Sequence, residues 1–434
     1  MAGDKKMRYF LSCLLLAGSA TGAFSQPRTI GVDEYMQRVI DYSHQLQIAR
    51  DNTVSAEESQ AVVRTGFLPR LDAGGNYSYQ FKKIGFDIGG ASFNMKPQTY
   101  QAEAALVQNI YSGSAVRNQY RMAELETEIS RLTERMTLDN VAYAAEYNYW
   151  NFAASEELMD ISTRNLEIVN RLYNLVNERF NGGLIARTDV LMVETRLKEA
   201  EFQHANVLNT YKVAGQNFNI LMGEAPDRNF AIADTILMAV VPPSFLPLDS
   251  VLSRRPDYQI ALRDIRYQEY GVKLSRSQYN PQLVGGVQGN WGTQMLNFDG
   301  KTIWNGAAYV QLNVPIFHWN ERRHAVRAAQ AQVNAAERQR LQVIDNVEQD
   351  LNNAMTNIQE TARQVEITRA SLSIASQNLE LNTFSYDEGK LTILDVLSAQ
   401  SSWLQAYTNA ITANLNHKLA IARYKQVISG LYGW

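Results

Sequence analysis

The sequence predicts an α+β membrane protein in which a few long strands are joined to very long helices. Glycine is absent from two long stretches, Ser114 to Asn181 and Ala307 to Glu388. Proline, which breaks helices, is absent from 98–225 and from 316 to the C-terminus. Four other segments alternate between apolar and polar residues, as amphipathic strands do. Long helices and long strands therefore occupy different parts of the chain.

The N-terminal residues 1–25 have the features of a cleaved signal peptide. A basic start precedes an apolar run at 9–17, and Ala-Phe-Ser at 23–25, with small residues at 23 and 25, offers a cleavage site. The only cysteine, Cys13, lies inside that apolar run rather than after it, which argues against lipidation. The net charge of −3 gives no basic surface for nucleic acid. We therefore expect an exported, non-lipidated protein that binds no nucleic acid.

The remaining chain consists of two similar halves, 26–223 and 249–434. The segment "FNGGLIARTDVL" from Phe180 is echoed by "YDEGKLTILDVL" from Tyr386, 206 positions later. Upstream, "FLPRL" is echoed by "YNPQL" 212 positions later, so the first half holds six extra residues between these markers. The join at 224–248 is rich in proline and is expected to be an irregular linker.

Each half is predicted to contain a helix, two strands and a pair of long helices. The expected strands are 69–83 and 98–110 in the first half and 281–292 and 303–315 in the second; the helix pairs are 113–222 and 319–430. A continuous helix from Ser114 to Arg179 would be about 100 Å long at 1.5 Å per residue. A helix of this length exceeds a compact domain and must form a rod.

The long helices carry apolar seams for neighbouring helices. In the second half one seam recurs every seven residues, at Ile344, Leu351, Ile358, Val365, Leu372 and Leu379. In the first half there are two: Ile161, Ile168, Leu172 and Leu175 form one, and Leu166, Val169, Tyr173, Val176 and Phe180 form the other. Heptad seams predict coiled-coil packing, and two seams on one helix indicate a neighbour on each side. An ordinary antiparallel bundle is the alternative.

The strands favour a membrane sheet. They are long, and their polar face is mostly uncharged. Aromatic side chains predicted to face the membrane lie toward their ends: Tyr77, Tyr79, Phe81, Tyr100, Trp291 and Trp304. An open sheet edge is not tolerated in lipid, and four strands do not close a barrel. Several copies must therefore combine; two would give eight strands and three would give twelve.

Several features of the chain occur together in one known family. They are the two halves, the segment from Arg254 to Leu283 that begins "RRPDYQIALRD", "NVPIF" at Asn313, and the two turns with the pattern G-x-x-x-x-x-D-V-L. In their order and spacing the chain resembles the TolC-type outer-membrane efflux family. The resemblance implies a homotrimer with a twelve-stranded barrel in the outer membrane. It also implies a helical barrel of coiled-coil pairs in the periplasm, which meets a periplasmic adaptor protein and an inner-membrane transporter.

The two glycine-containing turns are the predicted functional tip. Docking to the adaptor is expected at Gly182, Gly183, Leu184, Gly389, Lys390 and Leu391, and an aperture is expected at Asp189, Tyr386 and Asp395. We expect Thr188 with Asp189, and Thr392 with Asp395, to restart the helices after the turns. In relatives an arginine and a second aspartate help to close the entrance. Here Leu391 and Ser398 stand at those positions, so the closure is altered or absent.

No catalytic, cofactor or metal site is predicted. The five histidines lack ligand spacing, and no nucleophile elbow or phosphate-binding loop occurs. The hypothesis is a passive outer-membrane exit duct of a tripartite efflux system, which extends into the periplasm and is driven by a partner pump. A duct for type I protein secretion is the alternative within the class. A periplasmic coiled-coil structural protein is the alternative from another class. The substrates and the pump class stay open.

Overall fold

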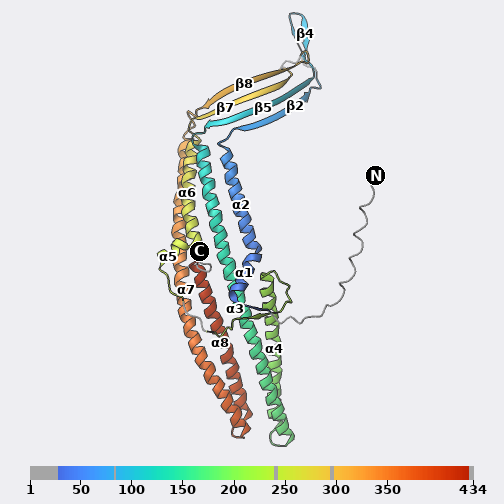
Figure 1. The fold of residues 1–434 in the computed structure, drawn as a ribbon, viewed down its shortest axis with the longest axis vertical. Coiled ribbons are helices and arrows are strands. Elements are labelled where there is room, and N and C mark those ends of the chain that lie inside the picture. The colour runs from blue at the N-terminus through green and yellow to red at the C-terminus, as the bar shows by residue number, and fades with distance from the viewer. Residues whose placement is uncertain (1–27, 83–84, 239–242, 294–297, 430–434) are drawn as a thin grey trace, which may run out of the picture.

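The computed structural model describes residues 28–82, 85–238, 243–293 and 298–429 (Figure 1). The expected signal peptide, 1–25, lies outside these residues. The molecule is elongated, with a sheet at one end and two helical turns at the other. Within the described ranges, no helix is both long and apolar enough to cross a membrane.

Four antiparallel strands form the main sheet in the order β2-β5-β7-β8. They span Arg70–Tyr79 (β2), Gln98–Tyr111 (β5), Gln282–Thr293 (β7) and Thr302–Asn313 (β8). Each corresponds to one of the four expected strands. Within the described part of the chain, β2 and β8 each pair with one strand only, so the sheet has two open edges.

Six long helices continue from the sheet as a single wall. They are α2 (His44–Thr65), α3 (Ala115–Asn181), α4 (Arg187–Leu221), α6 (Pro256–Ser277), α7 (Glu321–Asp387) and α8 (Ile393–Val427). Next to the sheet the helices lie in the order α2-α3-α6-α7, and toward the far end in the order α4-α3-α8-α7 (Figure 1). At every level, α7 forms one lateral edge of the wall, and α2 or α4 forms the other.

The two halves have matching elements. Helices α2 and α6 both have 22 residues, α3 and α7 both have 67, and α4 and α8 both have 35. Their bounds differ by the same spacings of 212 and 206 that relate the sequence echoes. The sequence repeat is therefore a repeat of structure.

The apolar seams lie at the expected contacts between helices. On α7, Leu351 and Ile358 are buried against α8 and α5 residues. On α3, Val176 is buried against both α4 and α8, while Val169 packs with α4. Helix α3 contacts both α4 and α8, which confirms the interpretation of α3 as an inner helix of a wall.

A compact core surrounds the middle of the wall. The short helices α1 (Val32–Tyr42) and α5 (Leu248–Arg254) pack there, and β1 (Arg28–Ile30) pairs in parallel with β6 (Phe230–Ile232). The rings of Tyr35 and Phe218 stack with centroids 4.1 Å apart. The expected irregular linker, 224–248, thus contains a strand. The prediction missed it because a three-residue strand is formed by its distant partner rather than by its own pattern.

The first half contains a hairpin that was not predicted. Strands β3 (Gly85–Ile88) and β4 (Ala91–Asn94) pair through a turn in which Gly89 and Gly90 have φ of 62° and 85°. Two successive positive φ values are those of a tight hairpin turn. The expected strand 69–83 therefore ends at Tyr79, and Phe81, predicted to be a strand aromatic, lies beyond the strand and is 97% exposed.

Candidate functional site

The strand register places apolar residues on one face of the main sheet. Leu71 lies opposite Leu106, which lies opposite Val287, which in turn lies opposite Ala308. Side chains that are directly opposite in neighbouring strands share a face. The predicted apolar face is therefore continuous across all four strands.

The aromatic residues of the strands lie on this same face. Tyr77 pairs with Tyr100, with ring centroids 5.3 Å apart, and Trp291 pairs with Trp304. All four side chains are 40–74% exposed, as is Tyr79 at 47%. No other described part of the chain covers this face. A face that is both apolar and uncovered needs an apolar environment from outside the chain.

The opposite face of the sheet is polar. Glu103 lies opposite Asn290, which lies opposite Asn305, and the next row on this face contains Asp72 and Gln288. Carboxamides and carboxylates remain hydrated and favour contact with water. The sheet therefore separates a face suited to lipid from a face suited to water.

The two predicted docking turns lie side by side at the end farthest from the sheet (Figure 1). Gly183 and Gly389 both have φ of 74°, and a Cβ added at either would meet no atom within 4 Å. The backbone conformation, and not the available space, thus requires glycine. The two turns also have equivalent backbone hydrogen bonds: Leu184 N donates to Arg179 O at 2.9 Å, and Lys390 N donates to Ser385 O at 2.8 Å.

The turns expose their apolar side chains. Leu184 is 76% exposed and Leu391 is 39% exposed, and Gly182 and Lys390 are also at the surface. Directly behind the turns, one hydrophobic core joins the ends of α3, α4, α7 and α8. Its buried members are Leu172, Val176, Val190, Val193, Tyr386, Ile393, Val396 and Leu397. A packed core thus holds two exposed turns at one end of the molecule.

The helices after the two turns begin differently. At α8, the Thr392 amide donates to Asp395 Oδ2 at 3.0 Å and the Asp395 amide donates to the Thr392 side chain, which together form a capping box. The Thr392 hydroxyl also donates to Asp395 Oδ2, at 2.6 Å. The hydrogen bond from the Thr392 hydroxyl, and to a smaller extent that from its amide, hold the pKa of the Asp395 carboxyl below its usual range. At α4 the equivalent position is Ala186, which has no side-chain acceptor. The expectation that Thr188 with Asp189 restarts α4 is therefore wrong: α4 begins at Arg187.

Tyr386 is held by an arginine that the sequence analysis missed. The Arg179 guanidinium lies 4.4 Å from the centre of the Tyr386 ring. It also donates to the carbonyl oxygens of Tyr386 and Asp387, both at 3.3 Å. Arg179 is in the last turn of α3 and Tyr386 in the last turn of α7. The pair therefore ties the two helical hairpins together just behind the turns.

A buried polar contact lies farther along the same hairpins. Gln400 on α8 is fully buried; it accepts from Arg196 Nε of α4 at 3.1 Å and donates to Asn165 Oδ1 of α3. A buried carboxamide is stable only when its bonds are made, so this contact fixes the relative positions of three helices.

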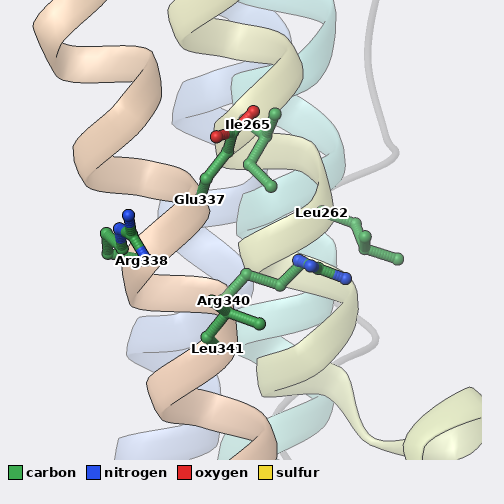
Figure 2. A pocket seen from close by; sticks show the side chains of 6 residues that line it. All are labelled: Leu262, Ile265, Glu337, Arg338, Arg340 and Leu341. Atoms are coloured by element: carbon green, nitrogen blue, oxygen red, sulfur yellow. The ribbon is translucent and has the colours of Figure 1, made fainter.

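A groove of about 560 Å³ lies between α6 and α7, and Figure 2 shows Arg340 extending from α7 toward α6. The lining residues are Leu262, Ile265, Glu337, Arg338, Arg340 and Leu341. The groove lies far from both the sheet and the turns and contains none of the predicted site residues. Across the described residues, no three His, Cys, Asp or Glu side chains gather as metal ligands would.

Known proteins share both the sequence pattern and this fold. The family model "Outer membrane efflux protein" matches residues 35–224 and 248–428. Outer membrane protein TolC of Escherichia coli is 22% identical over 98% of this chain and 85% of its own length. Nodulation protein T of Rhizobium leguminosarum bv. trifolii is 21% identical over 88% of this chain and 80% of its own length. The Campylobacter jejuni CmeC outer membrane channel superposes with a TM-score of 0.77 at 17% identity, and the match covers 92% of this chain and 86% of CmeC.

Proposed function

The chain belongs to the outer membrane efflux protein family, and we propose that it forms the homotrimeric exit duct of a tripartite efflux system. In this proposal each copy supplies four strands to a twelve-stranded barrel in the outer membrane, and its helices line a tunnel through the periplasm. The predicted signal peptide, 1–25, would direct export and be removed. The duct itself is passive, because an inner-membrane pump supplies the energy.

One observation carries this proposal: the chain is a wall with two unfinished edges at every level. The sheet ends at β2 on one side and β8 on the other, and the helical part ends at α2 or α4 and at α7. Unpaired strand edges and lipid are incompatible. A neighbouring copy satisfies both edges at once, since edge β8/α7 of one copy meets edge β2/α2/α4 of the next.

Apolar stripes on the edge helices support the same arrangement. On α7, three large side chains at heptad spacing are 61–69% exposed: Ile367, Ile374 and Leu381. On α4, at the other edge, a second stripe is 46–68% exposed: Leu191, Phe202, Val213 and Ile220. An exposed apolar stripe along a helix is suited to packing against another helix, and the α7 stripe has the heptad spacing of a coiled coil. Head-to-tail contact between the edges of identical copies closes into a ring when the rotation permits.

The different chemistry of the two faces of the sheet also supports a closed barrel in a membrane. The apolar face, with its exposed tyrosines and tryptophans, would contact outer-membrane lipid, and the polar face would line the aqueous passage. In such a barrel every backbone donor and acceptor of the strands has a partner.

The helical turns are the proposed periplasmic entrance. Leu184 and Leu391, beside the two glycines, offer exposed apolar contacts for a periplasmic adaptor. Asp189 and Asp395 would surround the aperture, where a ring of carboxylates favours cations. Tyr386, also predicted at the aperture, is buried in the core behind the turns and would position the helices there. The family resemblance implies an arginine at the position of Leu391; in this structure Arg179, on the other hairpin, contacts Tyr386.

Reconstitution tests the proposal. Protein extracted from outer membranes with detergent is expected to be trimeric and to form ion-conducting pores in planar bilayers, with larger cation than anion permeability. The matched control is a variant with Asp189→Asn and Asp395→Asn, which should conduct with reduced cation preference. A protein that is recovered as a soluble monomer without detergent, or that gives no conductance, would contradict the proposal.

A further inference from the structure

Each repeat turns two corners where helices meet strands. At the entry corner a helix leads into a strand, α2 into β2 and α6 into β7; at the exit corner a strand leads into a helix, β5 into α3 and β8 into α7. The exit corners have matching backbones 206 positions apart: Gly113 and Trp319 have φ of 62° and 44°, and Ser114 and Asn320 have φ of 77° and 66°. The two repeats therefore turn the same corner with different side chains.

Within the chain, the first repeat's exit corner packs on the second repeat's entry corner. Asn280 Nδ2 donates to Gly113 O at 3.1 Å. A Cβ added at Gly113 would lie 2.5 Å from Ser277 O, so the approach is too close for any side chain. This joint is small and polar, and it is made of residues that the chain already holds together.

The other two corners lie at opposite edges of the wall and are not covered by described residues. At the second repeat's exit corner, Ile316, Phe317 and Trp319 are 91%, 68% and 85% exposed. At the first repeat's entry corner, Phe67 and Leu68 are 46% and 63% exposed. Trp319 also has a left-handed backbone, which is unfavourable for a residue other than glycine. Both corners therefore present large apolar side chains to the outside.

We propose that these two corners join neighbouring copies, with Trp319 of one copy packed against Leu68 of the next. The inference rests on the proposed homotrimer and identifies one contact within it. Trp319 is 206 positions after Gly113, and Leu68 is 212 positions before Asn280, so the pair is the counterpart of the joint inside the chain. In the proposed ring, the second repeat of one copy lies beside the first repeat of the next, just as the first repeat lies beside the second within one chain. The same packing of an exit corner on an entry corner therefore recurs at each boundary between copies.

The chemical difference between the two kinds of joint has a physical reason. Repeats within one chain are held together covalently, so their joint needs no binding energy. Copies must associate, and tryptophan is among the residues that contribute most at interfaces between proteins. An apolar joint at this height also seals the seam where the sheet meets the helices.

Disulfide trapping tests the joint in the assembled protein. The only cysteine is Cys13, inside the expected signal peptide, so introduced thiols have no competitors in the mature chain. The Trp319→Cys/Leu68→Cys variant is expected to give covalently linked dimers and trimers on non-reducing gels after mild oxidation. Each single variant should stay monomeric on the same gels, as should Trp319→Cys/Val62→Cys, whose second position lies on α2 outside the corner.

A second variant avoids dependence on cross-linking. Trp319→Gly places at this corner the residue that the first repeat has, and glycine tolerates the positive φ, so the fold of each copy is retained. The variant trimer is expected to dissociate into monomers at a lower temperature than the wild-type trimer, with an unchanged circular dichroism spectrum.

The outcomes separate this inference from the proposed function. The joint is wrong, while the duct stands, if conducting trimers form without the Trp319–Leu68 cross-link and Trp319→Gly dissociates at the wild-type temperature. The joint is also wrong if a membrane-soluble maleimide labels Trp319→Cys fully in assembled trimers, because the corner then faces lipid. Monomers without conductance overturn both proposals.

Discussion

The two repeats share the lengths of their three long helices, and three of the positions at which they differ face something other than their own core. Both have helices of 22, 67 and 35 residues. They differ at the corner (Gly113 and Trp319), at the end of the long helix (Arg179 and Ser385), and at the start of the last helix (Ala186 and Thr392). The shared features build the wall, since a wall needs repeated geometry.

The differences show which contacts are not repeated around the wall. Arg179 ties the two hairpins of one chain, whereas Ser385, at the equivalent position, has no long side chain to tie the neighbouring copy's hairpin. In the proposed trimer, seams within a chain and seams between copies would therefore alternate in strength at the tip. We expect the entrance to widen at the seams between copies, with each chain's four-helix end moving as a unit.

The largest effect is expected from removing a feature that both repeats share. Gly183→Val and Gly389→Val each place a β-branched residue at φ of 74°, which costs on the order of 1–3 kcal/mol. Export, measured as substrate efflux from cells, should be lost in both, while trimers persist in the outer membrane. Gly389→Asn is the control, because asparagine tolerates this conformation, and it should retain export. Loss of trimers in the valine variants would make the glycines purely structural.

The next largest effect is expected from a contact at the tip that only the first repeat makes. Arg179→Ala removes a cation–π contact and two hydrogen bonds, which together contribute about 1–2 kcal/mol. The single-channel conductance of the reconstituted protein should therefore increase. Ser385→Ala, the matched variant in the other repeat, should leave the conductance unchanged. Equal conductance in both variants would show that the Arg179–Tyr386 tie does not restrict the aperture.

A smaller effect concerns the helix starts. Thr392→Ala removes the cap of α8 and should lower the free energy of unfolding by about 1 kcal/mol. The reciprocal change, Ala186→Thr, supplies a hydroxyl three residues before Asp189 and should stabilise α4 by a similar amount. Thermal unfolding followed by circular dichroism measures both. A destabilising Ala186→Thr would mean that the α4 start is fixed by packing instead of capping.

The smallest effect depends on pH. Because the pKa of Asp395 is lowered in the folded protein, its bonds to Thr392 stabilise the fold above the usual aspartate pKa of about 3.9. That contribution is lost as the pH falls through the lower folded value. Acid unfolding of wild type should therefore show a contribution from Asp395 that is absent from Asp395→Asn. Identical acid profiles for the two proteins would contradict it.

Much of the architecture was predictable because its signals are local. The strand alternation around Tyr77 and the absence of glycine from Ser114 to Asn181 act through neighbouring residues, and they placed strands and helices within a few positions. The β1–β6 pair and the Arg179 contact were missed because they join distant residues; Arg179 and Tyr386 are 207 positions apart. Contacts of this kind form only when the whole chain has folded, so no local sequence pattern indicates which two residues will meet.

The most direct test of the wall with two complementary edges is single-particle imaging of the protein extracted in detergent. The account predicts a closed ring of three copies, in which β8 of each copy pairs with β2 of the next to give twelve strands and α7 lies against α2 and α4 of that same neighbour. A particle of another copy number, or one in which β2 and β8 stay unpaired, would contradict it.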